Sequence, residues 1–346
     1  MEPQSQPVTS DMMQPQVGQI ITSNPLQFPA PITYIGEIKV TSDKKNASGF
    51  YDELNQSQFD GLQNWKTQLQ QQNVITDFVT YDDLYLLRFL RARKFDLVKT
   101  MLMFKNFLKW REDKHVDDIR EHFDFSEMLL VKEQYPHSYH KTDKFGRPIY
   151  IELISKVNLD KLFQVTTEER MISYYIREYE RLMKWRFPAC SAVLKKSIEQ
   201  SLTILDLENI GISNLVGKTK AFMLLATNIG QNYYPEMLGT MMLLNTSFFF
   251  NAVWAIIKVF IDEKTRKKIN FLGYKYQAKL LEYVDAENLP STLGGACTCS
   301  HITGGCLYAD IGPWNPRGEI QVGNTNTNTE LNQTTPIVAN PVVPNA

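Results

Sequence analysis

Strand-like and helix-like segments alternate along the second half of the chain, and this alternation constrains the fold more than any other feature. Four short apolar runs have the length and residue types of strands: 149–153, 201–207, 241–245 and 268–272. Segments with helical spacing separate or follow them, at 167–187, 217–230, 248–260 and 276–284. Strands that alternate with helices form βαβ units, so the sequence predicts an α/β domain with a largely parallel sheet.

Capping signals give the expected ends of several helices. Thr166 and Glu169 form a capping-box pattern, and the helix that they start is expected to stop before Pro188. Gly230 is expected to end the helix that begins at 217. Ser247 has a side chain that can cap a helix beginning at Phe248.

The part of the chain before this alternation has helical character only. Thr80 and Asp83 mark the start of a helix over 81–93, and Asp96 opens a second helix over 97–113. The sequence therefore predicts an N-terminal helical module at 45–125, followed by the α/β domain at 126–316. Residues 1–44 are expected to be a disordered or loosely ordered leader, and 317–346 a flexible tail, because both lack sustained apolar spacing.

The segment 241–261 is apolar enough to suggest a membrane, and it runs into a basic stretch at 264–268. Lys258 argues against a spanning helix, since a central lysine costs about 3 kcal/mol on insertion scales. We favour a buried strand ending near Asn245, followed by a helix that covers a ligand or contacts a membrane surface. Ordinary core and a membrane span remain the alternatives.

Composition and missing motifs narrow the function. The 43% hydrophobic content is that of a globular chain, and the net charge of −1 gives no overall attraction to nucleic acid. No secretory signal is visible at the N-terminus, so we expect a cytoplasmic protein. Neither GxGxxG nor a Walker A motif is present, and GxSxG and HExxH are also missing. Nucleotide-cofactor enzymes and the common hydrolase classes are therefore disfavoured.

One cluster of potential metal ligands stands near the C-terminus. Cys297, Cys299 and His301 alternate along the chain, and Cys306 follows five residues later between glycines. Soft ligands at close spacing can hold zinc, although this spacing fits no common structural site well. Free thiols on a loop, a zinc site and a reversible disulfide all remain open, and we predict no metal.

Six sequence blocks, taken together and in order, resemble the CRAL-TRIO lipid-transfer family. They are LLRFLRARKFD at 86–96, YHKTDKFGRPIY at 139–150, VTTEERM at 165–171, QNYYPEMLG at 231–239, AENLPSTLGG at 286–295 and LYADIGPW at 307–314. The resemblance covers about 78–316. It implies a helical module packed on a mixed, largely parallel sheet, with helices enclosing an apolar pocket for a single phospholipid and one helix as its gate.

The same resemblance implies particular site residues. The phosphatidylinositol headgroup would be bound by Arg93, Lys94, Glu236, Thr265 and Lys268. The phosphatidylcholine headgroup would be bound by Tyr139, Tyr150, Ser201 and Thr203. The gate helix would carry Phe248, Phe249, Phe250, Trp254 and Phe260. Glu236 can also pair with Lys268. For Arg88, Arg91, Arg93 and Lys94, the alternative is a solvated helix face or a surface patch for anionic lipid. Met237 and Glu208 depart from the family pattern.

We therefore expect a carrier that exchanges phosphatidylinositol and phosphatidylcholine between membranes and presents phosphatidylinositol to lipid kinases. No catalytic residue and no cofactor is expected, and the protein should be a monomer that contacts cytoplasmic Golgi or endosomal membranes transiently. A binder of another hydrophobe, such as a sterol, tocopherol or retinoid, is one alternative. A phosphoinositide-acting enzyme is another, but it would need a nucleophile with a base.

Overall fold

The computed structural model describes residues 38–40, 47–210, 217–246 and 250–320, which lie within one compact unit, 27–323. Most of the predicted leader, 1–44, and of the predicted tail, 317–346, falls outside the described residues. So do Ser247, Phe248 and Phe249. The domain boundaries that the sequence suggests, 45–125 and 126–316, stay predictions.

The α/β part contains a five-stranded sheet, and this confirms the predicted fold class. The strands follow one another in chain order: β1 (His137–Thr142), β2 (Pro148–Leu153), β3 (Ser201–Asp206), β4 (Leu238–Leu244) and β5 (Ile269–Phe271). β1 pairs antiparallel with β2, whereas β2, β3, β4 and β5 are parallel neighbours. Sequence analysis did not identify β1.

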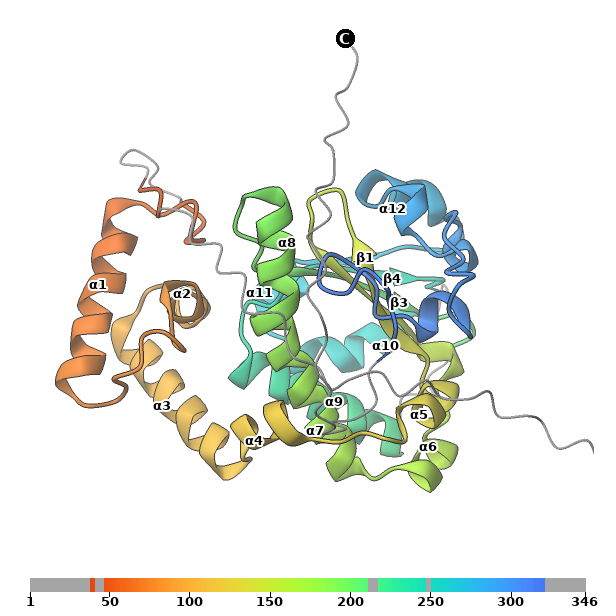
Figure 1. Cartoon of the computed structure of the whole chain (residues 1–346), viewed down its shortest axis with the longest axis horizontal. Helices are drawn as coiled ribbons and strands as arrows, with labels where there is room; N and C mark the ends of the chain where they lie inside the picture. Colours follow the sequence, from red (N-terminus) through yellow and green to blue (C-terminus); the bar gives the residue numbers. More distant parts are fainter. Residues whose placement is uncertain (1–37, 41–46, 211–216, 247–249, 321–346) are drawn as a thin grey trace, which may run out of the picture. The chain divides into compact units, whose positions relative to one another are not determined.

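The sequential strand order decides where the connecting helices lie. From β2 to β5, each new parallel strand lies on the same side of the strand that precedes it. Because crossovers between parallel strands are right-handed, all the connecting helices lie on one face of the sheet. They are α6 (Leu159–Val165), α7 (Glu168–Arg181), α8 (Phe187–Leu194), α9 (Gly217–Tyr233), α10 (Phe250–Ile257) and α11 (Glu263–Arg266). The opposite face is covered by α12 (Gln277–Tyr283) (Figure 1).

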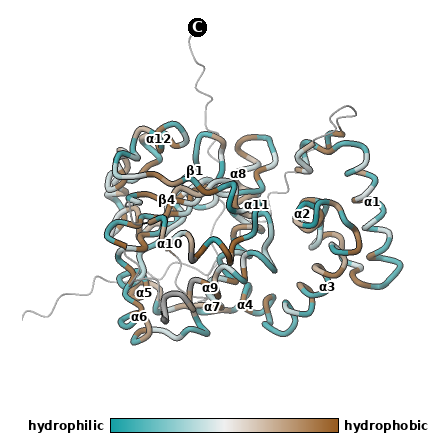
Figure 2. Tube along the Cα trace, turned by 180° about the vertical axis from the view of Figure 1, so that it is seen from behind, coloured by the Kyte–Doolittle hydropathy of each residue, from teal (hydrophilic) through white to brown (hydrophobic). Residues whose placement is uncertain are grey.

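Strand alternation gives the two faces of the sheet different roles. Ile149, Ile151, Leu202, Ile204, Met242 and Leu244 pack in a solid core with Leu280 and Val284 at the α12 side. The intervening residues face the connecting helices instead, where the candidate site lies. Figure 2 shows the contrast between apolar strands and the mostly hydrophilic α1.

The N-terminal part is helical as predicted. Its helices are α1 (Gln56–Gln71), α2 (Asp83–Ala92), α3 (Leu97–Asp113) and α4 (Val116–His122), whereas α5 (Met128–Gln134) packs with the helices of the α/β part. The rings of Trp65, Phe89 and Phe107 surround Phe104 with centroid distances of 5.0–5.8 Å. Buried ion pairs join this core to the α/β part: Arg91–Glu199 at 2.7 Å and Arg111–Glu180 at 2.8 Å.

Two predicted helix starts are wrong by one or two residues. Asp82, not Thr80, caps α2, because its carboxylate accepts the Tyr85 N–H at 2.8 Å. Thr167, not Thr166, caps α7 through the Arg170 N–H. Thr166 instead closes α6, and its hydroxyl donates to Glu127. Neighbouring polar residues compete for a cap, and the sequence pattern does not decide between them.

Two predicted helix ends are also wrong. Helical structure continues without a break past Pro188. A π-helical segment at Leu182–Arg186 leads directly into α8, and this local change in hydrogen bonding lies where the proline, which has no N–H to donate, enters the helix. α9 continues past Gly230 to Tyr233. At Gly230 a Cβ atom would lie 2.7 Å from the Tyr179 hydroxyl, so this glycine permits close helix packing and does not end the helix.

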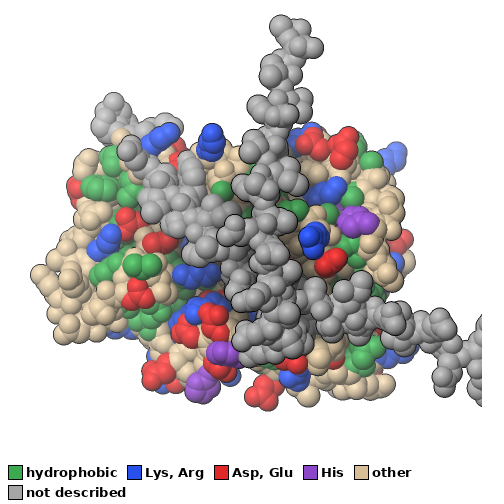
Figure 3. All heavy atoms as spheres, in the orientation of Figure 1, with side chains coloured by type: hydrophobic (Ala, Val, Ile, Leu, Met, Phe, Trp, Pro, Cys, Tyr) green, Lys and Arg blue, Asp and Glu red, His purple; other side chains and the backbone are tan. Residues whose placement is uncertain are grey.

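The segment 241–261 forms a strand and a separate helix, as predicted. β4 ends at Leu244, and α10 is followed by a 3₁₀ turn at Lys258–Phe260. Among the described helices, none combines the length and the hydropathy that crossing a bilayer requires. Acidic and basic side chains are interspersed over the described part of the face in Figure 3, in keeping with the net charge of −1.

Candidate functional site

A cavity of about 1080 Å³ lies between the sheet and the connecting helices. This volume slightly exceeds the range of about 300–1,000 Å³ for small-molecule sites. β1 to β5 supply the floor, and α7 and α9 supply walls that include Tyr174, Tyr175, Phe222 and Ala226. The cavity therefore combines a large volume with an aromatic and aliphatic wall.

One row of side chains crosses the floor from edge to edge of the sheet. Tyr139 pairs with Tyr150, Tyr150 with Thr203, Thr203 with Met241, and Met241 with Ile269. All five residues line the cavity. Because paired residues in adjacent strands point to the same face, the row is polar on β1–β3 and apolar on β4–β5. The floor thus has a polar end and an apolar end.

The ring of Tyr139 is held in place by a buried charge network. The guanidinium of Arg186 lies 3.9 Å from the ring centroid. Arg186 pairs with Glu178 at 2.8 Å and with Asp310 at 3.0 Å. Burial alone would raise the pKa of Glu178, but Arg186 and the neighbouring Arg181 and Arg177 lower it to about 2. Glu178 therefore stays ionised and fixes Arg186 against Tyr139.

Two other hydroxyl groups of the floor, those of Tyr150 and Ser201, already have partners. The Tyr150 hydroxyl donates to Glu152 at 2.9 Å, and burial raises the pKa of Glu152. The Ser201 hydroxyl donates to the Met237 carbonyl at 3.3 Å. Ser201 and Thr203 are two residues apart on β3 and face the cavity together. A ligand with acceptor oxygens can recruit these donors by a rotation about one bond.

Glu236 is the centre of the charged end of the cavity. Its carboxylate lies 2.8 Å from the Lys264 ammonium and 3.4 Å from that of Lys268. Burial alone would raise the pKa of Glu236, but Lys268 and Lys264 lower it below its usual value. Lys268 also donates to the Leu238 carbonyl at 2.7 Å. The Glu236–Lys268 pairing that the sequence suggests is present.

Three further predicted residues lie at this end. Arg93 follows the last turn of α2, and Lys94 has a left-handed backbone with φ 53°. Thr265 lies in α11, where its hydroxyl donates to Asp262 at 2.5 Å. Arg88 and Arg91, by contrast, are 5% and 3% exposed, so the alternative of a solvated helix face is wrong for them.

All nine predicted headgroup residues therefore line one cavity. Their roles as ligands of two lipids stay predictions. Sequence reasoning missed Glu152 and Glu178, which also line it. Glu152 had a usable signal, since it lies two residues from Tyr150 on a strand. No sequence signal pointed to Glu178, because its role depends on its ion pair with Arg186.

The described residues of the predicted gate helix pack beside the cavity and do not line it. Phe250 is buried, and the rings of Phe250 and Trp254 lie 5.6 Å and 4.9 Å from Phe271. Both belong to an apolar cluster that also includes the cavity residues Met241 and Ile269. Phe260 is 41% exposed. Gating by α10 stays a prediction.

The domain families agree with this architecture. The CRAL/TRIO domain matches residues 132–295, and the CRAL/TRIO N-terminal domain matches 51–106. The SEC14 cytosolic factor of Kluyveromyces lactis is 46% identical over 242 residues, which cover 70% of this chain and 79% of that protein. The chain belongs to the CRAL/TRIO family. The resemblance seen in the six sequence blocks is thereby confirmed.

Other relatives are longer or more distant. Phosphatidylinositol/phosphatidylcholine transfer protein SFH7 of Arabidopsis thaliana is 46% identical over 236 residues, which cover 68% of this chain and 43% of that protein. The chain thus spans less than half the length of this plant relative. A solved structure titled "Crystal structure of Sfh5" covers 62% of this chain with 20% identity and a TM-score of 0.46, a likeness too distant to assign the fold by itself.

Proposed function

We propose that this CRAL/TRIO protein carries one phosphatidylinositol or phosphatidylcholine molecule at a time and exchanges it at membrane surfaces. The observation that carries the proposal is a single large cavity with an apolar wall, a tyrosine and hydroxyl floor, and a lysine-rich end. The name of the plant relative, phosphatidylinositol/phosphatidylcholine transfer protein SFH7, points to the same activity. The acyl chains would occupy the apolar part of the cavity. A choline headgroup would bind at the tyrosine and hydroxyl floor, and an inositol headgroup would bind at the lysine-rich end.

The free energy of exposed lipid explains why such a cavity is needed. Two acyl chains contain about 30 methylene groups, and each costs about 0.8 kcal/mol to expose to water, so a bare phospholipid faces a barrier of about 25 kcal/mol. A protein that receives the chains while it is docked on a bilayer removes most of this barrier. The aromatic and aliphatic walls from α7 and α9 suit this task.

Two sets of polar groups would separate the headgroups. Tyr139 and Tyr150 can hold a quaternary ammonium against their ring faces, while Ser201 and Thr203 donate to the phosphate. Lys268, Arg93 and Lys94 can bind the phosphate of an inositol lipid, and Glu236 can accept hydrogen bonds from inositol hydroxyls. A sterol or retinoid carrier would have no use for so many charged groups in its cavity.

The decisive experiment removes proposed ligands of the inositol headgroup and leaves the proposed ligands of the choline headgroup unchanged. Glu236→Gln and Lys268→Gln variants are assayed for transfer of labelled phosphatidylinositol and labelled phosphatidylcholine between vesicles. We expect phosphatidylinositol transfer to fall at least tenfold while phosphatidylcholine transfer stays within twofold. Lys279→Gln removes an exposed lysine of another ion pair and serves as the charge-matched control. Equal loss of both activities in folded protein would contradict the division of the site.

The cellular part of the proposal follows from exchange. A carrier that delivers phosphatidylinositol would present it to lipid kinases on the cytoplasmic face of Golgi or endosomal membranes, acting as a monomer. Adding the protein and a phosphatidylinositol kinase to vesicles should raise phosphoinositide formation, and the Lys268→Gln variant should not. Phosphoinositide consumption by the purified protein alone would instead favour an enzyme.

A further inference from the structure

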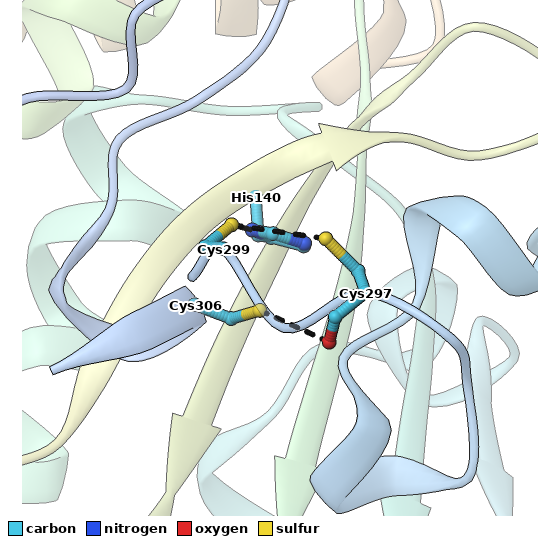
Figure 4. A group of neighbouring side chains, drawn as sticks. All are labelled: His140, Cys297, Cys299 and Cys306. Carbon is cyan, nitrogen blue, oxygen red and sulfur yellow. Dashed lines mark hydrogen bonds between the residues drawn. The ribbon is translucent and has the colours of Figure 1, made fainter. Parts of the chain in front are cut away.

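The cysteine cluster near the C-terminus includes a fourth potential metal ligand that the sequence spacing does not reveal. His140, Cys297, Cys299 and Cys306 each place one potential ligand atom so that all four atoms lie within 4.8 Å of one another. His140 comes from β1, and the cysteines come from the loop before and within the turn at Gly305–Tyr308 (Figure 4). His301, the histidine of the local sequence pattern, is exposed and is not a member of this group.

The distances within the cluster suit a tetrahedral ion. Zinc binds thiolates at about 2.3 Å and imidazole at about 2.0–2.1 Å, so tetrahedral geometry sets ligand atoms about 3.5–3.8 Å apart. The Cys297 and Cys299 sulfurs are 3.7 Å apart, and the Cys299 sulfur is 4.0 Å from Nδ1 of His140. The remaining ligand atoms lie within 4.8 Å of one another. Three sulfurs and one imidazole form the Cys₃His donor set of structural zinc sites.

Burial sets this cluster apart from ordinary surface thiols. His140 is 0% exposed, Cys299 5% and Cys306 8%. Nε2 of His140 is buried without a hydrogen-bond partner among the described residues. A buried polar atom without a partner costs about 1–3 kcal/mol, and a metal bound through Nε2, the ring nitrogen other than the Nδ1 that lies near Cys299, would recover that cost.

The backbone of the loop that carries the cysteines contains left-handed residues close to the cluster. Cys299 adopts a left-handed conformation with φ 46°, and Gly304 and Gly305 have φ 89° and 69°. The Cys306 thiol turns back toward the Cys297 carbonyl at 3.4 Å. Beyond the loop, Ile311 pairs with His140, and its carbonyl accepts the Lys141 N–H at 2.5 Å. The chain thus wraps from Cys297 to Ile311 around one side of β1.

We propose that His140, Cys297, Cys299 and Cys306 bind one Zn²⁺ ion as a structural site. Four protein ligands leave no open position for a substrate, so the ion has no catalytic role. It ties the C-terminal loop to β1. Because side chains alternate along a strand, the ion would bind on one face of β1, and the adjacent Tyr139 would face the cavity on the other.

The metal content of the full chain tests this directly. The protein is purified under reducing, anaerobic conditions, and zinc is measured per chain by mass spectrometry. Zinc-free protein is then titrated with Co²⁺ as a spectroscopic probe. We expect one zinc per chain, and with Co²⁺ the thiolate charge-transfer and tetrahedral d–d bands, saturating at one equivalent. Zinc addition should also raise the melting temperature of the zinc-free protein.

Variants separate this site from adventitious binding. Cys299→Ser and Cys306→Ser should lose stoichiometric binding. His301→Ala and Cys190→Ser should keep it, because His301 is outside the cluster and Cys190 lies on α8. No saturable cobalt spectrum in reduced, folded wild-type protein would overturn the proposal. Zinc binding that His301→Ala abolishes would overturn it too, and so would a Cys297–Cys299 or Cys299–Cys306 disulfide in protein that binds no metal after reduction.

Discussion

The orientation of Tyr139 depends on charged residues that are not among the nine proposed headgroup ligands. Arg186 lies against the ring, and Glu178 and Asp310 hold Arg186. A guanidinium buried to 1% exposure is stable only if carboxylates pair with it. The choline side of the proposed site therefore rests on a charge network rather than on packing alone.

The pH dependence of stability tests this network. The pKa of Glu178 is depressed from the ordinary glutamate value to about 2 in the folded protein. Its contribution to stability is therefore fully present above about pH 5 and is lost as the pH falls toward 2. Glu178→Gln should lower the free energy of unfolding by about 3–5 kcal/mol at pH 7, because Arg186 loses a buried partner. Urea unfolding monitored by circular dichroism measures the difference.

The difference between wild type and Glu178→Gln should shrink between pH 5 and pH 3. Glu282→Gln, which changes an exposed pair with Lys279, should shift stability by no more than about 0.5 kcal/mol at any pH. A Glu178→Gln effect that stays constant down to pH 3 would mean that this carboxylate does not stabilise the fold through its charge.

The two hydroxyls of β3 give a second prediction at this scale. Ser201→Ala combined with Thr203→Val removes both donors and keeps nearly the same volume. Each lost hydrogen bond to a phosphate is worth about 1.5–3 kcal/mol, so phosphatidylcholine affinity should fall at least tenfold. Phosphatidylinositol affinity should change less. Binding of each lipid from vesicles measures the two effects, and equal losses would refute separate headgroup sites.

The face on which a strand residue lies was predictable from the sequence, whereas most contacts between distant segments were not. Ser201 and Thr203 share a face because they are two residues apart on one strand. Glu236 and Lys268 also meet as suggested. The partner of the cysteine cluster could not be found in this way, since His140 is 157 or more positions away in the chain and only the packing of the loop on β1 brings it there.

Helix α9 shows how tertiary packing overrides a local signal at the scale of an element. Glycine commonly follows the end of a helix, and Gly230 was therefore expected to end this one. The helix instead continues, since the missing side chain lets α9 approach Tyr179 on α7. The same cause explains the cap assignments, where Asp82 and Thr167 are selected by geometry that the sequence pattern does not contain.

This close approach gives a prediction for α9. On propensity alone, Gly230→Ala should stabilise a helix by about 1 kcal/mol. Here the new methyl group would lie 2.7 Å from the Tyr179 hydroxyl, so we expect a loss of stability of about 1–3 kcal/mol. Chemical denaturation of the single variant measures the sign.

A double variant separates the clash from other effects. Tyr179→Phe removes the hydroxyl, and Gly230→Ala in that background should be neutral or stabilising. If Gly230→Ala raises stability in the wild-type background, the two helices are farther apart than described.

At the scale of the whole molecule, buried ion pairs join the helical part to the α/β part. Glu180 on α7 pairs with Arg111 on α3 at 2.8 Å and accepts the Tyr234 hydroxyl at 2.9 Å. Glu180→Ala leaves Arg111 buried with only its Asp117 partner, so the free energy of unfolding should fall by about 3–5 kcal/mol. Asp113→Ala at an exposed pair is the control. Thermal unfolding that is unchanged by Glu180→Ala would show that this junction contributes nothing.

The account as a whole depends on what fills the cavity between the sheet and the connecting helices. Lipid extracted from protein purified from a eukaryotic host, and quantified by mass spectrometry, tests this most directly. We predict about one phospholipid per chain, divided between phosphatidylinositol and phosphatidylcholine. Sterol or retinoid in place of phospholipid, or protein that carries no lipid and acquires none from vesicles, would contradict the central claim.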